Sequence, residues 1–151
     1  ESIPALKKGF LFCLENECDF WERRMYSYAL ARMGDKEQRK YVLDSLMKIG
    51  QFIGEDFAYF KDDEMVWKYI ETNYFSKERY PILSDFDIHA SLKTMSDVYP
   101  YIKSVPKELE YSDSFKTMEE EYRWAKNLYE WLMANKRKVK FDYEGEKEFS
   151  W

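Results

Sequence analysis

Residues that break regular structure are scarce in this sequence, which has five glycines and four prolines among 151 residues. A β fold with many tight turns relies on both residue types, so their scarcity argues against such a fold. The long stretches between them space their apolar residues with a helical period. No uninterrupted apolar run approaches the roughly 18 residues of a transmembrane helix. The sequence therefore predicts a soluble, mostly helical protein with no membrane span.

Residues that usually carry catalysis are also few. Glycine-rich phosphate-binding loops are absent, and the single histidine, His89, has no glutamate at the spacing of a ferritin-like di-metal site. Asp85 lies four residues before His89, and Ser84 and Ser91 flank it, but no nucleophile turn accompanies them. We interpret His89 as structural or solvent-exposed, and we expect no cofactor.

Only two cysteines occur, Cys13 and Cys18. On one continuous helix they would lie about 140° apart, which would strain a disulfide between them. Reduced thiols in a cytoplasmic protein are the simpler expectation. With His89 they make three of the four ligands of a structural zinc site, so we interpret them as small buried hydrophobes without a metal.

Charge and aromatic rings are abundant. Charged residues make up 35% of the chain and leave a net charge of -5, which opposes broad binding to a phosphate backbone. The chain has 13 tyrosines, 11 phenylalanines and 5 tryptophans, although aromatic residues are weak helix formers. We expect these rings to pack a core or to contact a partner protein.

Apolar spacing and capping residues predict an all-α fold, a compact bundle of five or six helices in a single domain over residues 1–151. Carboxylates or serine precede most of these helices. Five predicted helices cover residues 3–15, 20–33, 62–75, 84–99 and 115–137, and the second of these follows a cap at Asp19. A further helix is predicted after Asp35, with Val42, Leu46, Ile49 and Ile53 on one face.

Helical spacing also predicts which side chains form the core. Trp21, Met25 and Tyr28 share one face of the second predicted helix, and we expect every tryptophan on a helix to be buried. The last predicted helix has an apolar face of about half its circumference, wide for a surface helix. A central position in the fold or a homodimer would cover that face.

The C-terminal segment, residues 138–151, changes to a period of two, with Val139, Phe141 and Tyr143 alternating with polar residues. This pattern predicts either a short β-hairpin or a tail that docks on the helices. A hairpin alone is marginally stable in water, so the segment must contact the helices or a partner.

The functional hypothesis that these features favour is a small cytoplasmic protein-binding domain, such as an inhibitor, an immunity-type protein or an accessory subunit. Its acidic charge would steer a basic partner protein, and exposed rings would hold that partner. The residues expected at this surface are Asp62, Asp63, Glu64, Tyr143, Phe149 and Trp151.

Two alternatives remain. One is a helical enzyme or metal-binding protein that uses His89 with carboxylates from residues 55–56, 62–64 and 119–121, although acidic residues at helix starts are explained by the helix dipole. The other is a nucleic-acid accessory protein that uses the basic run Lys136, Arg137, Lys138 and Lys140, although cations are also favoured at a helix end.

Overall fold

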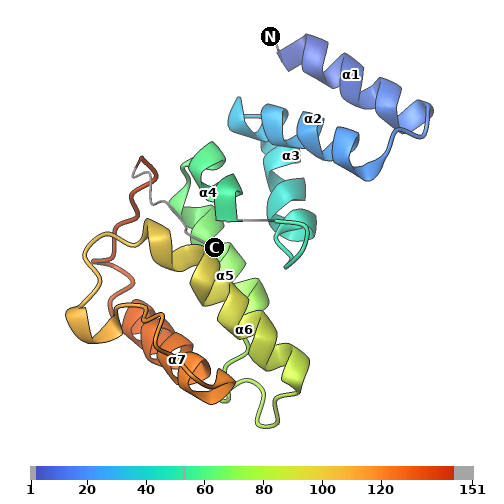
Figure 1. Ribbon diagram of the computed structural model, residues 1–151. Coiled ribbons are helices and arrows are strands. Elements are labelled where there is room, and N and C mark those ends of the chain that lie inside the picture. The colour runs from blue at the N-terminus through green and yellow to red at the C-terminus, as the bar shows by residue number, and fades with distance from the viewer. Residues whose placement is uncertain (1–2, 53, 145–151) are drawn as a thin grey trace. The chain divides into compact units, whose positions relative to one another are not determined.

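The computed structural model describes residues 3–52 and 54–144, which belong to two compact units, residues 1–47 and residues 48–151. The described residues form seven α-helices, one π-helical segment and two short 3-10 helices, with no strand among them (Figure 1). The all-α prediction is confirmed. A bundle of five or six helices is not supported, and the prediction of a single domain stays a prediction.

The first unit contains three α-helices and the π-helical segment: α1 (Ile3–Glu15), α2 (Phe20–Arg32), α3 (Lys36–Tyr41) and η1 (Val42–Leu46). The second unit contains α4 (Gly54–Phe60), α5 (Asp63–Asn73), α6 (Asp85–Val98), the 3-10 helices η2 (Tyr99–Tyr101) and η3 (Lys107–Leu109), and α7 (Met118–Ala134).

Side-chain caps start α2 and α3 where the sequence predicts them. The Asp19 carboxylate accepts a hydrogen bond from the Glu22 N–H at 2.9 Å, and the Asp35 carboxylate accepts one from the Gln38 N–H at 2.9 Å. Each bond satisfies a backbone donor that has no partner within its helix. Gly34, with a φ of 94°, ends α2 in the left-handed conformation that glycine adopts without strain.

The helix predicted after Asp35 ends earlier than its apolar spacing indicates. Val42 and Leu46 are buried as expected, but they lie in the π-helical η1, and the α-helix stops at Tyr41. Ile49 N–H donates to the side chain of Asn73 at 3.0 Å, so it is not available to a continuing helix. The prediction of one continuing helical face is therefore wrong at Ile49, and Ile53 lies outside the described residues.

Helices α1 and α2 lie side by side and pack closely at one glycine (Figure 1). A Cβ atom on Gly9 would lie 2.5 Å from the ring of Tyr26, so glycine is what allows this approach. Leu6 and Cys13 are the buried residues of α1, one turn or so on each side of Gly9. The contact between the two helices is thus confined to a narrow stripe of α1.

The core of the second unit is built around the ring of Tyr69 on α5. Phe52 and Phe57 lie against it, with ring centroids 5.6 Å and 5.2 Å away. The Tyr69 hydroxyl donates to Asp97 of α6 at 2.7 Å, and Lys93 donates to the other oxygen of Asp97 at 3.0 Å. Burial, followed by the negative charge of Asp97, raises the pKa of Tyr69 above its ordinary value, so the hydroxyl remains a donor at neutral pH.

Aromatic contacts also hold α7 in the second unit. Trp124 is buried, and its indole N–H donates to the Leu109 carbonyl at 3.0 Å. The Tyr111 ring meets Trp124 edge-on at 5.0 Å, and Tyr129 stacks on Tyr74 at 3.8 Å. Part of the wide apolar face of α7 therefore packs within the unit, and the central position and the homodimer both stay predictions.

The described part of the C-terminal segment packs on the rest of the second unit and pairs with it at a single residue, Phe141. Phe141 forms an isolated antiparallel bridge with Ile102, and its ring meets Trp67 edge-on at 5.4 Å. The predicted hairpin is not supported among the described residues, because Phe141 pairs with a distant segment and not with a neighbouring turn. Residues 145–151 lie outside the described part.

The first testable prediction concerns Asp35, which caps α3 and whose carboxylate lies 2.7 Å from the Lys7 ammonium. Replacing the cap in Asp35→Ala should lower the free energy of unfolding by about 1 kcal/mol. Lys7, and then the Gln38 N–H, lower the pKa of the Asp35 carboxyl below its ordinary 3.8. The cost of the substitution should therefore be complete above pH 3.8 and fade as the pH falls through the lower folded-state pKa.

Urea unfolding at neutral and at acidic pH measures this difference. Asp44→Ala is the matched control, because its ion pair with Lys40 is exposed and should contribute little. The capping role of Asp35 would be contradicted if Asp35→Ala did not lower the free energy of unfolding at neutral pH, or if its effect grew on acidification.

The second prediction concerns the buried hydroxyl of Tyr69. Tyr69→Phe keeps the ring in the core but removes the donor to Asp97. The free energy of unfolding should fall by roughly 1.5–3 kcal/mol, because a hydrogen bond to a charged acceptor is lost. Chemical denaturation checks this value against Tyr80→Phe, an exposed tyrosine whose substitution should change little. Equal stability of the two variants would refute the role given to Tyr69.

Candidate functional site

The acidic residues expected at a partner surface lie at the start of α5. Asp62 caps this helix, and its carboxylate accepts a hydrogen bond from the Glu64 N–H at 2.9 Å. Asp63, in the first helical turn, accepts a hydrogen bond from the Tyr143 hydroxyl at 2.6 Å. The structure therefore brings together two residues that lie 80 positions apart and that the sequence assigns to one surface.

Tyr143 also packs on its own chain. Its ring centroid lies 5.9 Å from that of Tyr101 and 6.5 Å from that of Phe141. Burial, followed by the hydrogen bond to Asp63, raises the pKa of Tyr143, so its hydroxyl stays a donor at neutral pH. These contacts dock the segment, and a partner-binding role for the group stays a prediction.

The remaining two expected residues, Phe149 and Trp151, lie outside the described residues.

The basic run lies just after α7. All four basic residues are exposed, and the Lys136 ammonium lies 5.1 Å from the centroid of the Trp67 ring and 3.6 Å from a Glu71 carboxylate oxygen. Lys136 thus has structural contacts of its own. Nucleic-acid binding by these four residues stays a prediction.

The hydroxyl groups nearest to His89 have structural roles. His89 is exposed on α6, whereas Ser91 is buried. The Ser91 hydroxyl donates to the Asp87 carbonyl at 2.8 Å and accepts from the Phe75 N–H at 2.9 Å. Ser84 caps α6 through the Asp87 N–H. Both serine hydroxyls near His89 therefore already have hydrogen-bond partners in the backbone, which does not favour either as a nucleophile paired with His89.

An exposed apolar face on α2 is the first feature that the sequence did not predict. Trp21 and Met25 are 54% and 69% exposed, whereas Tyr28 on the same face is buried. The expectation of a buried stripe is wrong at Trp21 and Met25 for the described structure. Periodicity identified the shared face correctly, but nothing covers its N-terminal half in the described residues.

Helix α1 adds exposed apolar residues to those of α2. Leu11, Phe12 and Leu14 are exposed, although Leu6 and Cys13 already fill the stripe that faces the rest of the unit. A helix that has apolar side chains on its exposed side as well as on its buried side usually contacts another element or a partner. We refer to Leu11, Phe12, Leu14, Trp21 and Met25 as the α1–α2 apolar surface.

Neighbouring side chains hold Trp21 in place. The Phe20 ring meets it edge-on at 5.5 Å, and the Arg24 guanidinium lies 5.1 Å from its ring centroid. The same guanidinium lies 4.3 Å from the centroid of the buried Tyr28 ring. An exposed tryptophan that is already ordered loses less entropy when a partner covers it.

The two units differ in charge. Residues 1–47 contain eight acidic and eight basic side chains, so residues 48–151 carry the entire net charge of -5. The α1–α2 apolar surface therefore belongs to a unit with no net charge, and the acidic character expected from the sequence belongs to the other unit.

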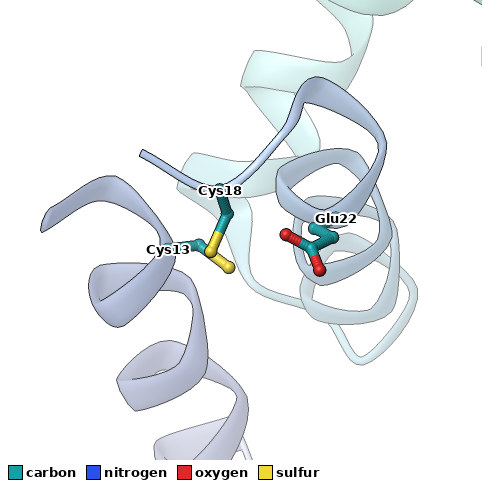
Figure 2. Close-up of side chains that lie close together, drawn as sticks. All are labelled: Cys13, Cys18 and Glu22. Atoms are coloured by element: carbon teal, nitrogen blue, oxygen red, sulfur yellow. The ribbon is translucent and has the colours of Figure 1, made fainter. Parts of the chain in front are cut away.

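Cys13, Cys18 and Glu22 form the one group of potential metal ligands found among the described residues (Figure 2). Their two sulfur atoms and a carboxylate oxygen all lie within 4.8 Å of one another. Helix α1 ends at Glu15, so Cys18 lies in the following turn, where its N–H donates to the Cys13 carbonyl at 3.1 Å. The expected separation of about 140° on one helix is therefore wrong, and both thiols are free.

The thiol of Cys18 is harder to ionise in this group than a free cysteine thiol. The hydrogen bond with Cys13 is the main cause that raises the pKa of the Cys18 thiol to about 12, with burial and Glu22 adding to it. Sequence reasoning paired the cysteines with His89, which lies in the second unit. The spacing Cys-x4-Cys-x3-Glu pointed to Glu22 and was missed.

Comparison with protein-family models, with curated proteins and with solved structures gave no match. In the described part of the chain, no helix combines the length and the apolar character that crossing a membrane requires.

Proposed function

We propose that this protein is a protein-binding domain and that the α1–α2 apolar surface is its contact surface. One observation carries the proposal. Of the twelve exposed large apolar side chains in the described residues, seven belong to residues 1–47, which make up less than a third of the chain. Five of these seven lie on α1 and α2, two helices that pack against each other, and large exposed apolar patches mark interaction surfaces.

The side chains present are those that contribute most to protein interfaces. Tryptophan is enriched among the residues that dominate binding energy, and methionine adapts to irregular partner surfaces. Complete burial of a phenylalanine or methionine side chain is worth about 1.5–3 kcal/mol. Because Phe12 is 61% exposed and Met25 69% exposed, each has most of that stabilisation still to gain from a partner.

The partner that fits is a basic protein with an apolar contact face. The apolar face would cover Phe12, Trp21 and Met25 of the neutral unit. The net charge of -5 on the other unit would attract the basic residues and speed the encounter. In this proposal the first unit provides the apolar contact with the partner, and the second unit provides the negative charge that attracts it.

The third prediction uses site-specific photo-crosslinking in the native cells. A benzophenone amino acid at position 12 should give one discrete covalent adduct with a partner protein. The same amino acid at position 86 is the matched control, because Phe86 is 70% exposed but belongs to α6 of the second unit. Equal adducts at both positions, or an adduct between two copies of this chain, would contradict the proposed partner surface.

Titration calorimetry with the purified partner then tests the surface directly. Phe12→Ser and Met25→Ser should each weaken binding about tenfold, which corresponds to a loss of about 1.4 kcal/mol. Phe86→Ser should leave the affinity unchanged. All three positions are exposed, so the variants should remain as stable as the unaltered protein. An affinity that is insensitive to positions 12 and 25 would exclude the α1–α2 apolar surface.

A further inference from the structure

We propose that Cys13, Cys18 and Glu22 bind a single Zn²⁺ ion at the turn between α1 and α2, with one coordination position left open. This inference goes beyond protein binding and does not depend on it. The three side chains come from the end of α1, the connecting turn and the first turn of α2, and Figure 2 shows the carboxylate facing the two sulfur atoms.

The distances suit a zinc ion. Zinc binds cysteine sulfur at about 2.3 Å and carboxylate oxygen at about 2.0–2.2 Å, which places neighbouring ligands of a tetrahedron about 3.6–3.8 Å apart. The three ligand atoms already lie within 4.8 Å of one another. Closure therefore needs movements of about 1 Å or less. Glu22 is exposed and Cys18 is half-buried, so their side chains have room to move.

The backbone holds the three ligands in this arrangement before any ion arrives. The Cys18 N–H donates to the Cys13 carbonyl at 3.1 Å, and the Glu22 N–H donates to the capping Asp19 carboxylate at 2.9 Å. Both bonds lie within the turn that carries the ligands. The spacing of four residues between the cysteines is also within the range common in zinc sites.

A divalent cation would hold this group together, because it stabilises two thiolates and a carboxylate side by side. Binding converts two thiols and Zn²⁺ into a zinc bis-thiolate and releases two protons, with no change in oxidation state.

The set of ligands also determines the kind of site. Structural zinc sites have four protein ligands, whereas three protein ligands leave a position for water or another group. Three ligands are present among the described residues. The ion would join the end of α1 to the start of α2, and these are the helices that carry the α1–α2 apolar surface.

The test, which is the fourth prediction, is a titration of the full-length protein with Co²⁺ and then Zn²⁺ in the presence of a phosphine reductant. One equivalent of Co²⁺ should give a thiolate-to-cobalt charge-transfer band and visible bands of tetrahedral cobalt, and Zn²⁺ should displace it. Affinity should rise with pH by up to about 100-fold per unit, because two protons leave. Bound Zn²⁺ should also raise the thermal unfolding midpoint.

Three variants make the result specific. Cys18→Ser should abolish the charge-transfer band, and it is preferred to Cys13→Ser because Cys13 is buried and its loss also disturbs packing. Glu22→Gln should weaken binding at least about tenfold, since even groups that only support a metal ligand contribute about 10 to 100-fold. Glu17→Gln is the matched control from the same turn and should bind as the unaltered protein does.

Three outcomes would overturn the proposal. One is the absence of a thiolate band at stoichiometric Co²⁺. Another is metal binding that survives Cys18→Ser in a protein whose circular dichroism shows a folded state. The third is a Cys13–Cys18 disulfide that persists in the reductant, which would assign the pair to a covalent link and not to a metal.

Discussion

The hydroxyl of Tyr69 is the constraint around which the second unit is organised. This group is buried in an aromatic cluster, and a buried hydroxyl left without a partner would cost about 1–3 kcal/mol. Asp97 on α6 supplies the acceptor. Because the Tyr69 hydroxyl on α5 must reach this acceptor, the hydrogen bond constrains how α5 and α6 pack. Phe52 and Phe57 then close the space around the ring. The abundance of aromatic residues in the sequence has its main explanation in this kind of packing.

The first unit follows a different logic. Its helices α2 and α3 begin at local caps, α1 and α2 approach closely at Gly9, and the buried residues of α1 form only a narrow stripe. Residues that a larger core would have covered, such as Phe12 and Trp21, remain exposed. A neutral unit with uncovered rings beside the turn that holds Cys13 and Cys18 is where we place both proposed activities. The second unit carries the net negative charge.

Most helix starts could be predicted because capping is a local property. Asp19, Asp35, Asp62 and Ser84 each cap the helix that the sequence assigned to them. Burial at Trp21 could not be predicted, because periodicity shows which residues share a face but not whether another element covers it. The proximity of the two cysteines was missed for a related reason. It depends on α1 ending at Glu15 and on a positive φ at Glu17, which a non-glycine residue rarely adopts.

The central claim is that Trp21 and Met25 on α2 are uncovered in the free protein, whereas the core around Tyr69 in the second unit is closed to solvent. Hydroxyl-radical footprinting of the free protein, read by mass spectrometry at each residue, tests it most directly. We predict rapid labelling of Met25 and Trp21, and strong protection of Met65 and Met95, which are buried in the second unit. Protection of Met25 and Trp21 equal to that of Met95 would show that this face is already covered in the free protein and would contradict the account.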